Sequence, residues 1–250
     1  MPIGAALAPV GGFLEPNQVA TVQYWYDAER LTGLGSGSAV GTWTDRGGSS
    51  FHATQATASK QPIYNTSAQN GLPAVSFDGV DDFLGATSGK TYGSGSLQSF
   101  IWVGRQATGT GLGGAISYQE TDNIPVRLAE FVNATSGRRF RQRESAGTGY
   151  TTVTHATLAT AWGIGIVSIG TAGTLATLNV NGSDEATATG SGTWGTELVR
   201  DLFLGAQNAG SVNFLNGTLG EVLIIDQDLD TWQRLQMARY AHYKWAVPWL

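Results

Sequence analysis

Short apolar runs separated by tight-turn residues recur along most of this 250-residue chain. Glycine is abundant, at 35 residues, whereas charged residues make up only 13% of the sequence. Such a balance favours many short strands joined by tight turns over long solvated helices. We therefore predict an all-β protein with antiparallel, meandering strands. The dipeptides that tolerate the positive φ of hairpin turns are Asn70-Gly71, Asp78-Gly79, Asn181-Gly182 and Asn216-Gly217.

The length and the strand pattern indicate one folding unit. At 250 residues the chain is long enough for one large β-sandwich. No long Ser/Pro or Gly/Ser linker divides it. Strand-like runs between turn signals occur at residues 74–77, 100–103, 115–118, 125–131, 164–169, 175–180, 202–204 and 219–225.

An apolar arm precedes this unit. Proline and glycine residues interrupt both helix and strand periodicity there, so we expect residues 1–20 to form an extended arm and residues 21–250 a single sandwich domain. The apolar side chains of the arm would be poorly solvated if they were left free, so we expect them to anchor it on its own domain or on a partner. These side chains are Ile3, Leu7, Val10, Phe13 and Leu14.

One short helix is expected near the C-terminal end, at residues 230–245. Asp230 can cap this helix, and Gln233 follows three residues later, as in a capping box. Good helix formers continue through Lys244. We expect one broad apolar face to lie against the sandwich, where loss of Trp232 would cost several kcal/mol. That face consists of Trp232, Leu235, Ala238, Tyr243 and Ala246.

Composition excludes several partner classes. The formal net charge of −5 provides no positive field that would draw the chain onto nucleic acid or an anionic membrane. Cysteine is absent, which excludes a disulfide scaffold and thiol chemistry. No apolar run reaches the roughly 18 residues of a spanning helix, and the N-terminus lacks the basic region of a secretory signal. We therefore expect no nucleic acid partner, no membrane insertion and no export by a secretion signal.

The order of several motifs resembles the concanavalin A-like, laminin G-like jelly roll, which is an antiparallel β-sandwich. Residues 77–83, with the sequence Phe-Asp-Gly-Val-Asp-Asp-Phe, and the late strand at 214–226 carry most of this resemblance. Other segments match in a consistent order from about Val22 to Trp245. They are residues 24–28, the Trp-Thr-Asp-Arg-Gly-Gly turn at 43–48, and residues 52–55, 61–62, 70–79, 161–162 and 178–182.

The resemblance implies a non-enzymatic binding or structural role. Such modules are similar to lectin and laminin G domains of adhesins and to domains that decorate bacteriophage heads, tails and fibres. From the resemblance and the missing secretion signal, we expect a virion surface module made in the host cytoplasm. Its partners would be capsid or tail subunits or copies of itself, with host cell-surface glycan as a further ligand. The alternative is a lectin-like carbohydrate-binding or adhesion domain at an extracellular or cell surface.

A glycan hydrolase or lyase is the third interpretation, and the acidic residues argue against it. Retaining hydrolysis needs two carboxylates about 5 Å apart, but the Glu-x-Asp-x-x-Glu motif of sandwiches resembling laminarinases has no match. Glu221 and Asp226 are an odd number of positions apart, so a regular strand would point them to opposite faces. The histidines His52, His155 and His242 lack metal-chelating spacing. We expect no catalytic residue and no required cofactor.

An acidic loop is the candidate metal site. Asp78, Asp81 and Asp82 cluster within five residues, and calcium prefers such oxygen ligands. In the alternative interpretation, Asp78-Gly79 makes a turn while Asp81 and Asp82 accept backbone N–H groups without any metal. Calcium is therefore a candidate ligand of this loop and not a requirement of the fold.

A cationic strand is the candidate contact for a ligand or a partner. Arg139, Arg141 and Arg143 would share one face of an extended strand and grip carboxylate, sulfate or phosphate groups in bidentate fashion. In the alternative interpretation they form a solvated sheet face partly neutralised by Glu130 and Glu144. The sequence leaves both interpretations open.

Aromatic side chains in polar surroundings are further candidate contacts, because aromatic rings can stack on sugar faces. Tyr150 and Trp194 lie in polar contexts, and Trp249 lies in a terminal one. Packing beneath a loop is the alternative for all three. The tryptophans in apolar runs are expected in the core, and these are Trp25, Trp102 and Trp162.

Overall fold

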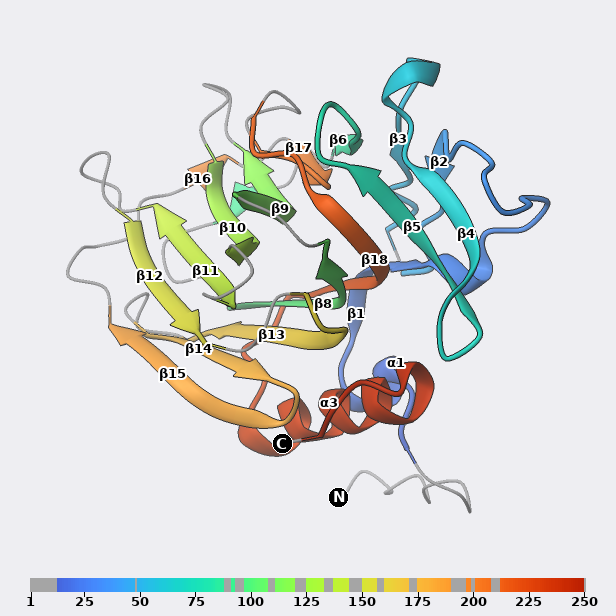
Figure 1. The fold of residues 1–250 in the computed structure, drawn as a ribbon. Helices are drawn as coiled ribbons and strands as arrows, with labels where there is room; N and C mark the ends of the chain where they lie inside the picture. The colour runs from blue at the N-terminus through green and yellow to red at the C-terminus, as the bar shows by residue number, and fades with distance from the viewer. Residues whose placement is uncertain are drawn as a thin grey trace.

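Two antiparallel β-sheets and a C-terminal helix make up the computed structural model (Figure 1). It describes residues 13–47, 49–87, 91–92, 97–107, 111–119, 125–132, 137–143, 150–156, 160–170, 175–189, 197–198, 201–207 and 212–249. Sheet A has the strand order β15-β14-β13-β8-β18-β5-β4, and β1 also pairs with β18. Its strands are β1 (Val22–Asp27), β4 (Ile63–Gln69), β5 (Leu72–Asp78), β8 (Gln98–Gln106), β13 (Gly163–Ile169), β14 (Leu175–Val180), β15 (Ser183–Thr189) and β18 (Asn216–Ile225).

Sheet B has the order β12-β11-β10-β9-β17-β6-β3-β2. Its strands are β2 (Thr42–Trp43), β3 (Ala53–Thr54), β6 (Leu84–Thr87), β9 (Leu112–Gln119), β10 (Pro125–Val132), β11 (Arg138–Arg143), β12 (Tyr150–His155) and β17 (Asp201–Leu204). A small ribbon pairs β7 (Thr91–Tyr92) with β16 (Glu197–Leu198). The helical elements are α1 (Pro16–Val19), α3 (Thr231–Trp245) and the 3₁₀ turns η1 (Ala28–Arg30) and η2 (Ala58–Lys60).

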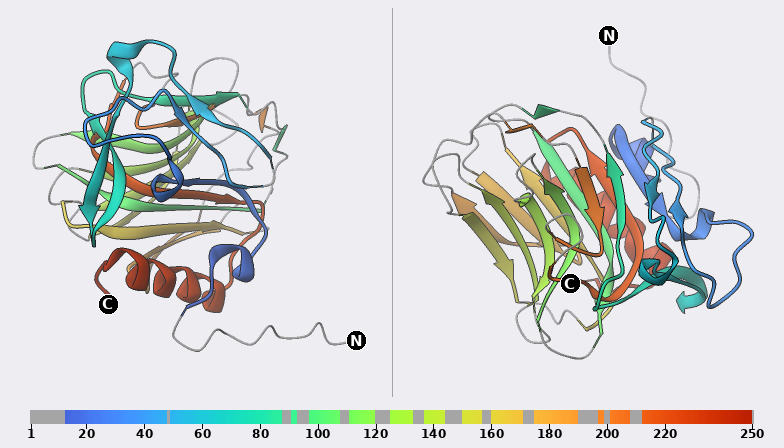
Figure 2. Two further views of the ribbon diagram at one scale, coloured as in Figure 1. Left: turned by 90° about the vertical axis from the view of Figure 1, so that its right-hand side faces the viewer. Right: turned by 90° about the horizontal axis from the view of Figure 1, so that it is seen from above.

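The molecule has three layers, because α3 lies across the face of sheet A that points away from sheet B (Figures 1 and 2). Successive side chains of a strand point to opposite faces. In β8, Phe100 and Trp102 therefore pack between the sheets, whereas Ile101 and Val103 pack in the layer beneath α3. The all-β sandwich with one C-terminal helix is thus confirmed. Trp25, Trp102 and Trp162 are buried, as predicted.

Each predicted strand run lies within a strand of one of the two sheets. Asn70 and Asn181 adopt positive φ values of 51° and 55°, as the hairpin prediction requires. The prediction of a turn at Asn216-Gly217 is wrong, because Asn216 begins β18 and pairs with Asp78 of β5. Both a strand start and a tight turn favour Asn-Gly, so only the pairing within the sheet shows which of the two structures these residues adopt.

The motif at 43–48 closes the edge of β1 that does not face β18. Asp45 Oδ1 accepts hydrogen bonds from the backbone N–H groups of Trp25 (2.8 Å) and Gly47 (2.7 Å), and Oδ2 accepts one from Phe51 (3.1 Å). A Cβ atom at Gly47 would lie only 2.1 Å from the carbonyl oxygen of Gln23. One carboxylate therefore holds the loop on the strand, and glycine allows the close approach.

The predicted buried face of α3 is wrong in part. Trp232 is 54% exposed and Tyr243 is 50% exposed, and Ala246 lies outside the helix at its C-cap. Asp230 and Gln233 do form the predicted capping box. The helix carries apolar residues nearly all around, so the sequence pattern alone does not select one face. The side chains that pack on sheet A are Met237, Ala238, Tyr240, Ala241 and Trp245.

The arm is described from Phe13 onward, so Ile3, Leu7 and Val10 lie outside the described residues. Phe13 contacts the rings of Tyr240 and Tyr243 of α3, and Leu14 packs on the apolar cluster beneath α3. These contacts place this end of the arm on its own domain. The expectation of a fully extended arm is wrong at 16–19, where a proline at the first position starts the short helix α1. Among the described residues, no helix is long and apolar enough to cross a membrane.

The corrected helix face predicts different costs for two tryptophan truncations. Trp245 is fully buried and stacks on Trp162 with ring centroids 5.8 Å apart, so Trp245→Ala should lower the free energy of unfolding by about 3–5 kcal/mol. Trp232→Ala is the matched control and should change it by less than about 0.5 kcal/mol. Urea unfolding of both variants makes the comparison. Similar losses for the two variants would contradict the packing described here.

Candidate functional site

A buried carboxylate joins α3 to sheet A. Glu221 of β18 is fully buried beneath α3. Its Oε1 accepts hydrogen bonds from Trp25 Nε1 (2.6 Å) and from the Tyr240 hydroxyl (2.8 Å). Its Oε2 accepts from Trp245 Nε1 (2.9 Å) and Lys244 Nζ (3.2 Å). Burial raises the pKa of Glu221, and the positive charge of Lys244 opposes that shift. With four donors around it, this acid is a structural anchor.

Asp27 extends the same charge cluster toward solvent. Its Oδ2 accepts from Arg46 Nη1 (2.8 Å) and Lys244 Nζ (3.1 Å). A cavity of about 360 Å³ opens beside it, lined by Glu29, Arg30 and these charged residues among others. The acids and bases there pair with one another. The cluster therefore attaches α3 to sheet A, and its acids do not form a catalytic pair.

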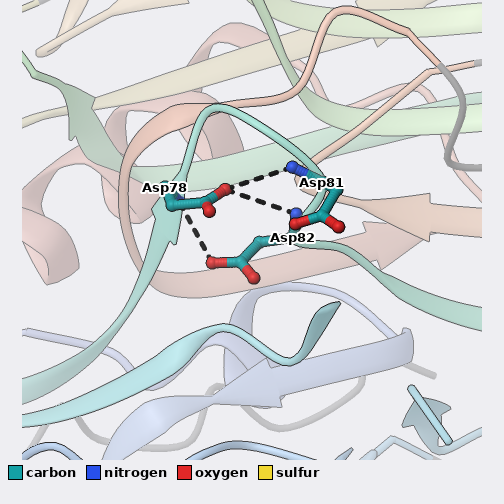
Figure 3. A group of neighbouring side chains, drawn as sticks. All are labelled: Asp78, Asp81 and Asp82. Carbon is teal, nitrogen blue, oxygen red and sulfur yellow. Dashed lines mark hydrogen bonds between the residues drawn. The ribbon is translucent and has the colours of Figure 1, made fainter. Parts of the chain in front are cut away.

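The acidic loop makes its own hydrogen bonds (Figure 3). Asp78 Oδ1 accepts from the backbone N–H groups of Val80 (2.8 Å), Asp81 (3.2 Å) and Asp82 (3.4 Å). In return, Asp82 Oδ2 accepts from the backbone N–H of Asp78 (3.0 Å). One oxygen from each aspartate lies within 4.8 Å of the others, and such a group of oxygens can coordinate a cation. Calcium binding by this loop stays a prediction.

The environment of Asp82 disfavours its charged form. Its side chain is largely buried, at 5% exposure. Burial, followed by the neighbouring charge of Asp78, raises the pKa of Asp82 to about 6. The positive φ of Gly79 (79°) and the position of Asn216, 2.6 Å from where a Cβ of Gly79 would lie, keep the loop tight against β18. The loop therefore holds a carboxyl group that titrates near neutral pH.

Two arginines of the predicted stripe, Arg139 and Arg141, lie on the outer face of sheet B. Arg139 and Arg141 alternate with Phe140, which packs between the sheets. Arg139 lies opposite Glu130 of β10 in register and donates from Nε to Glu130 Oε2 (2.8 Å). Arg141 donates from Nε to Oε2 and from Nη2 to Oε1 of the same carboxylate, both at 2.7 Å. Glu130 therefore fixes both guanidinium groups side by side.

Further hydrogen bonds hold Glu130 in place. It is fully buried, and Gln207 Nε2 donates to its Oε1 at 2.5 Å. Asn213 Nδ2 in turn donates to Gln207 Oε1 at 2.9 Å. The side chains of Arg139 and Arg141 keep 18% and 20% exposure. This chain of hydrogen bonds orients the two arginines toward solvent with little freedom.

Two threonines border the arginines on the neighbouring strand. Thr152 pairs with Arg141 and Thr154 with Arg139 in register, and both threonines are exposed. Paired residues of antiparallel strands lie on the same face. The alternation Thr-Val-Thr at 152–154 is the signal that the sequence analysis missed, because Val153 packs between the sheets. Two guanidinium groups and two hydroxyl groups thus share one surface.

The structure does not place the other predicted contact residues on this surface. Arg143 pairs with Tyr150 at the end of the β11–β12 ladder, but their side chains lie outside the described part of the structure. Trp194 also lies outside it. Trp249 is 41% exposed, and its indole lies beside Gly182, between β14 and β15 of sheet A. The histidines are dispersed: His52 accepts a backbone hydrogen bond from Asp45, His155 is buried, and His242 belongs to α3.

Comparison with known proteins identifies the fold. No family model matches the sequence, and no curated protein sequence matches it. The binding domain of botulinum neurotoxin serotype G superposes with a TM-score of 0.64 at 12% identity, over 92% of this chain and 54% of that chain. The binding domain of botulinum neurotoxin DC, solved in complex with SialylT, gives 0.59 at 9% identity, over 90% of this chain and 52% of that one.

A smaller module is also similar. The CBM40 of Ruminococcus gnavus IT-sialidase, bound to α2,3 sialyllactose, gives a TM-score of 0.50 at 13% identity, over 58% of this chain and 83% of that chain. The present chain spans about half the length of the neurotoxin binding domains. At these identities the likeness establishes the β-sandwich fold. These structures come from toxins and a sialidase and give no support to the expected bacteriophage context.

The raised pKa of Asp82 predicts a pH dependence of stability. Because the folded-state pKa of about 6 exceeds the ordinary value of 3.8, the folded protein binds a proton that the unfolded chain releases. This contribution is fully present below about pH 4 and is lost as the pH rises through about 6. In chelator, Asp82→Asn should therefore gain stability relative to the native protein as the pH rises from about 4 to 7. Denaturant unfolding at each pH measures the difference.

Asp201→Asn is the control for this experiment, because it makes the same change of net charge on sheet B. That variant should keep the decline in stability seen in the native protein. A difference between Asp82→Asn and the native protein that stays constant over the same pH range would contradict the assignment.

Proposed function

We propose that this protein is a non-enzymatic, lectin-like module that binds an acidic glycan of the sialic acid class through the outer face of sheet B. The observation that carries the proposal is the pair Arg139 and Arg141, fixed by the buried Glu130. The two guanidinium groups place positive charge on this face, although the whole chain has a net charge of −5. A fixed guanidinium pair suits the planar, bidentate recognition of a carboxylate.

The surroundings of the arginines also suit a sugar. The side chains of Arg139 and Arg141 are partly exposed, so a ligand oxygen can approach their guanidinium groups. The hydroxyl groups of Thr152 and Thr154 can donate to and accept from sugar hydroxyls. Glu130 prevents the two arginines from moving when a ligand arrives, so little side-chain entropy is lost on binding.

The fold comparison supports the same class of ligand. The CBM40 was solved with sialyllactose, and the neurotoxin DC binding domain with SialylT. The structurally similar proteins are binding domains, which also favours a binding role over a glycan hydrolase or lyase. A virion module that binds host glycans through this face is compatible with the proposal, and assembly with capsid or tail subunits stays a prediction from the sequence alone.

Titration with 3′-sialyllactose, with lactose as the neutral control, tests the proposed function. Sialyllactose should bind and lactose should bind at least about tenfold more weakly, because only the former carries a carboxylate. Thr154→Glu places a negative charge beside Arg139 at an exposed position and should weaken sialyllactose binding by about tenfold or more. Thr154→Gln adds a neutral side chain of similar size, so it should weaken binding much less than Thr154→Glu does.

Arg141→Ala provides a second test, with Arg105→Ala as its control on an exposed residue of β8. The first variant should lose binding and the second should keep it, while circular dichroism shows that both remain folded. The proposal fails if sialyllactose and lactose bind equally, or if Thr154→Glu and Arg141→Ala both bind like the native protein.

A further inference from the structure

A second group of aromatic and cationic side chains lies at the C-terminal end of α3. Arg239, His242, Tyr243 and Trp249 line a cavity of about 250 Å³. Because α3 covers the outer face of sheet A, this cavity is separated by both sheets from the arginines on the outer face of sheet B (Figures 1 and 2). It shares no residue with that face, so it can be tested by itself.

The aromatic rings of the cavity are exposed yet held in place. Tyr243 is 50% exposed and Trp249 is 41% exposed. The ring of His242 contacts both of them, with centroids 5.3 Å from Tyr243 and 5.9 Å from Trp249. Phe13 stacks on Tyr243 with centroids 5.7 Å apart, and a Cβ atom at Gly182 would lie 3.6 Å from the indole of Trp249. The rings therefore form a preorganised apolar surface that faces water.

Two polar side chains of the cavity can still form hydrogen bonds or ion pairs with a ligand. His242 Nδ1 lies 2.8 Å from the carbonyl oxygen of Val247. A carbonyl only accepts, so Nδ1 carries the hydrogen, and Nε2 of the neutral ring is left as an acceptor. Within the described part of the chain, Arg239 makes neither an ion pair nor a side-chain hydrogen bond. The cavity thus offers an acceptor for a hydroxyl group and a cation without a counter-ion.

From this arrangement we infer that the cavity binds a single pyranose residue that carries a carboxylate. The apolar face of the sugar would stack on Trp249 and Tyr243, the carboxylate would pair with Arg239, and a hydroxyl group would donate to His242 Nε2. The volume of about 250 Å³ is below the roughly 300–1,000 Å³ of pockets for drug-sized ligands, which suits one sugar residue at a chain end. The inference extends the proposed function by a second, independent site.

The test uses the Thr154→Glu protein, in which binding to the face of sheet B is expected to be weakened. The probes are the methyl glycosides of N-acetylneuraminic acid and glucuronic acid, with methyl galactoside as the neutral control. Binding is followed by NMR through the indole N–H signal of Trp249, assigned by its loss in Trp249→Ala. At least one acidic probe should shift this signal in a saturable way, and the neutral probe should bind about tenfold more weakly.

Two variants locate the site. Arg239→Gln should weaken binding of the acidic probe by about tenfold and remove its preference over methyl galactoside. Trp232→Ala is the matched control, because Trp232 is also exposed on α3 but does not line the cavity, and its affinity should be unchanged. The inference is overturned if neither acidic probe shifts the Trp249 signal at tens of millimolar, or if Arg239→Gln binds like the native protein.

The outcome is independent of the proposed site on sheet B. Binding that Thr154→Glu abolishes, with no response of the Trp249 signal, would refute the helix cavity and leave the sheet site standing. Binding that persists in Thr154→Glu and is lost in Arg239→Gln would support the cavity and leave the sheet site to its own titration.

Discussion

The buried carboxylate of Glu221 decides how the third layer of this protein is attached. Its four donors come from β1 and from the last two turns of α3, and they include the indole N–H groups of Trp25 and Trp245. A buried charge that loses a partner is costly, so the observed rotation of α3, which supplies three of the four donors, is favoured over rotations that would remove them. That rotation places Tyr240 and Trp245 against sheet A and leaves Trp232 and Tyr243 in water. The exposed aromatic surface of α3 is therefore a consequence of satisfying a buried charge.

Local signals in the sequence were sufficient to predict many of the strands, the class of fold and the capping box of α3, whereas strands such as β4, β12 and β15 were not predicted. They were not sufficient to predict the face of α3, because apolar residues lie nearly all around this helix. The contacts that decide it are the hydrogen bonds from Tyr240 and Trp245 of α3 to Glu221 of β18, and the pattern of apolar residues along the helix does not report them. Asn216-Gly217 fails for a related reason, since the same dipeptide suits a turn and the start of β18.

The candidate site could also be predicted only in part from the sequence. Alternation along β11 correctly placed Arg139 and Arg141 together, because that rule needs no knowledge of neighbouring strands. The neutralising role of Glu130 was one of two open alternatives, and choosing between them required the register that sets it opposite Arg139. The contributions of Gln207 and Thr154 depend on strands that only the tertiary fold brings together. The hydrogen bonds within the acidic loop follow from its turn geometry.

A rigid sandwich that fixes an arginine pair on one sheet is the physical basis of the proposed glycan recognition. Its most direct test is a crystal structure of the protein with 3′-sialyllactose. The sugar carboxylate should lie within about 2.7–3.2 Å of a guanidinium nitrogen of Arg139 or Arg141, with Glu130 still bound to both arginines. An ordered sialyllactose whose carboxylate lies away from both guanidinium groups would contradict it.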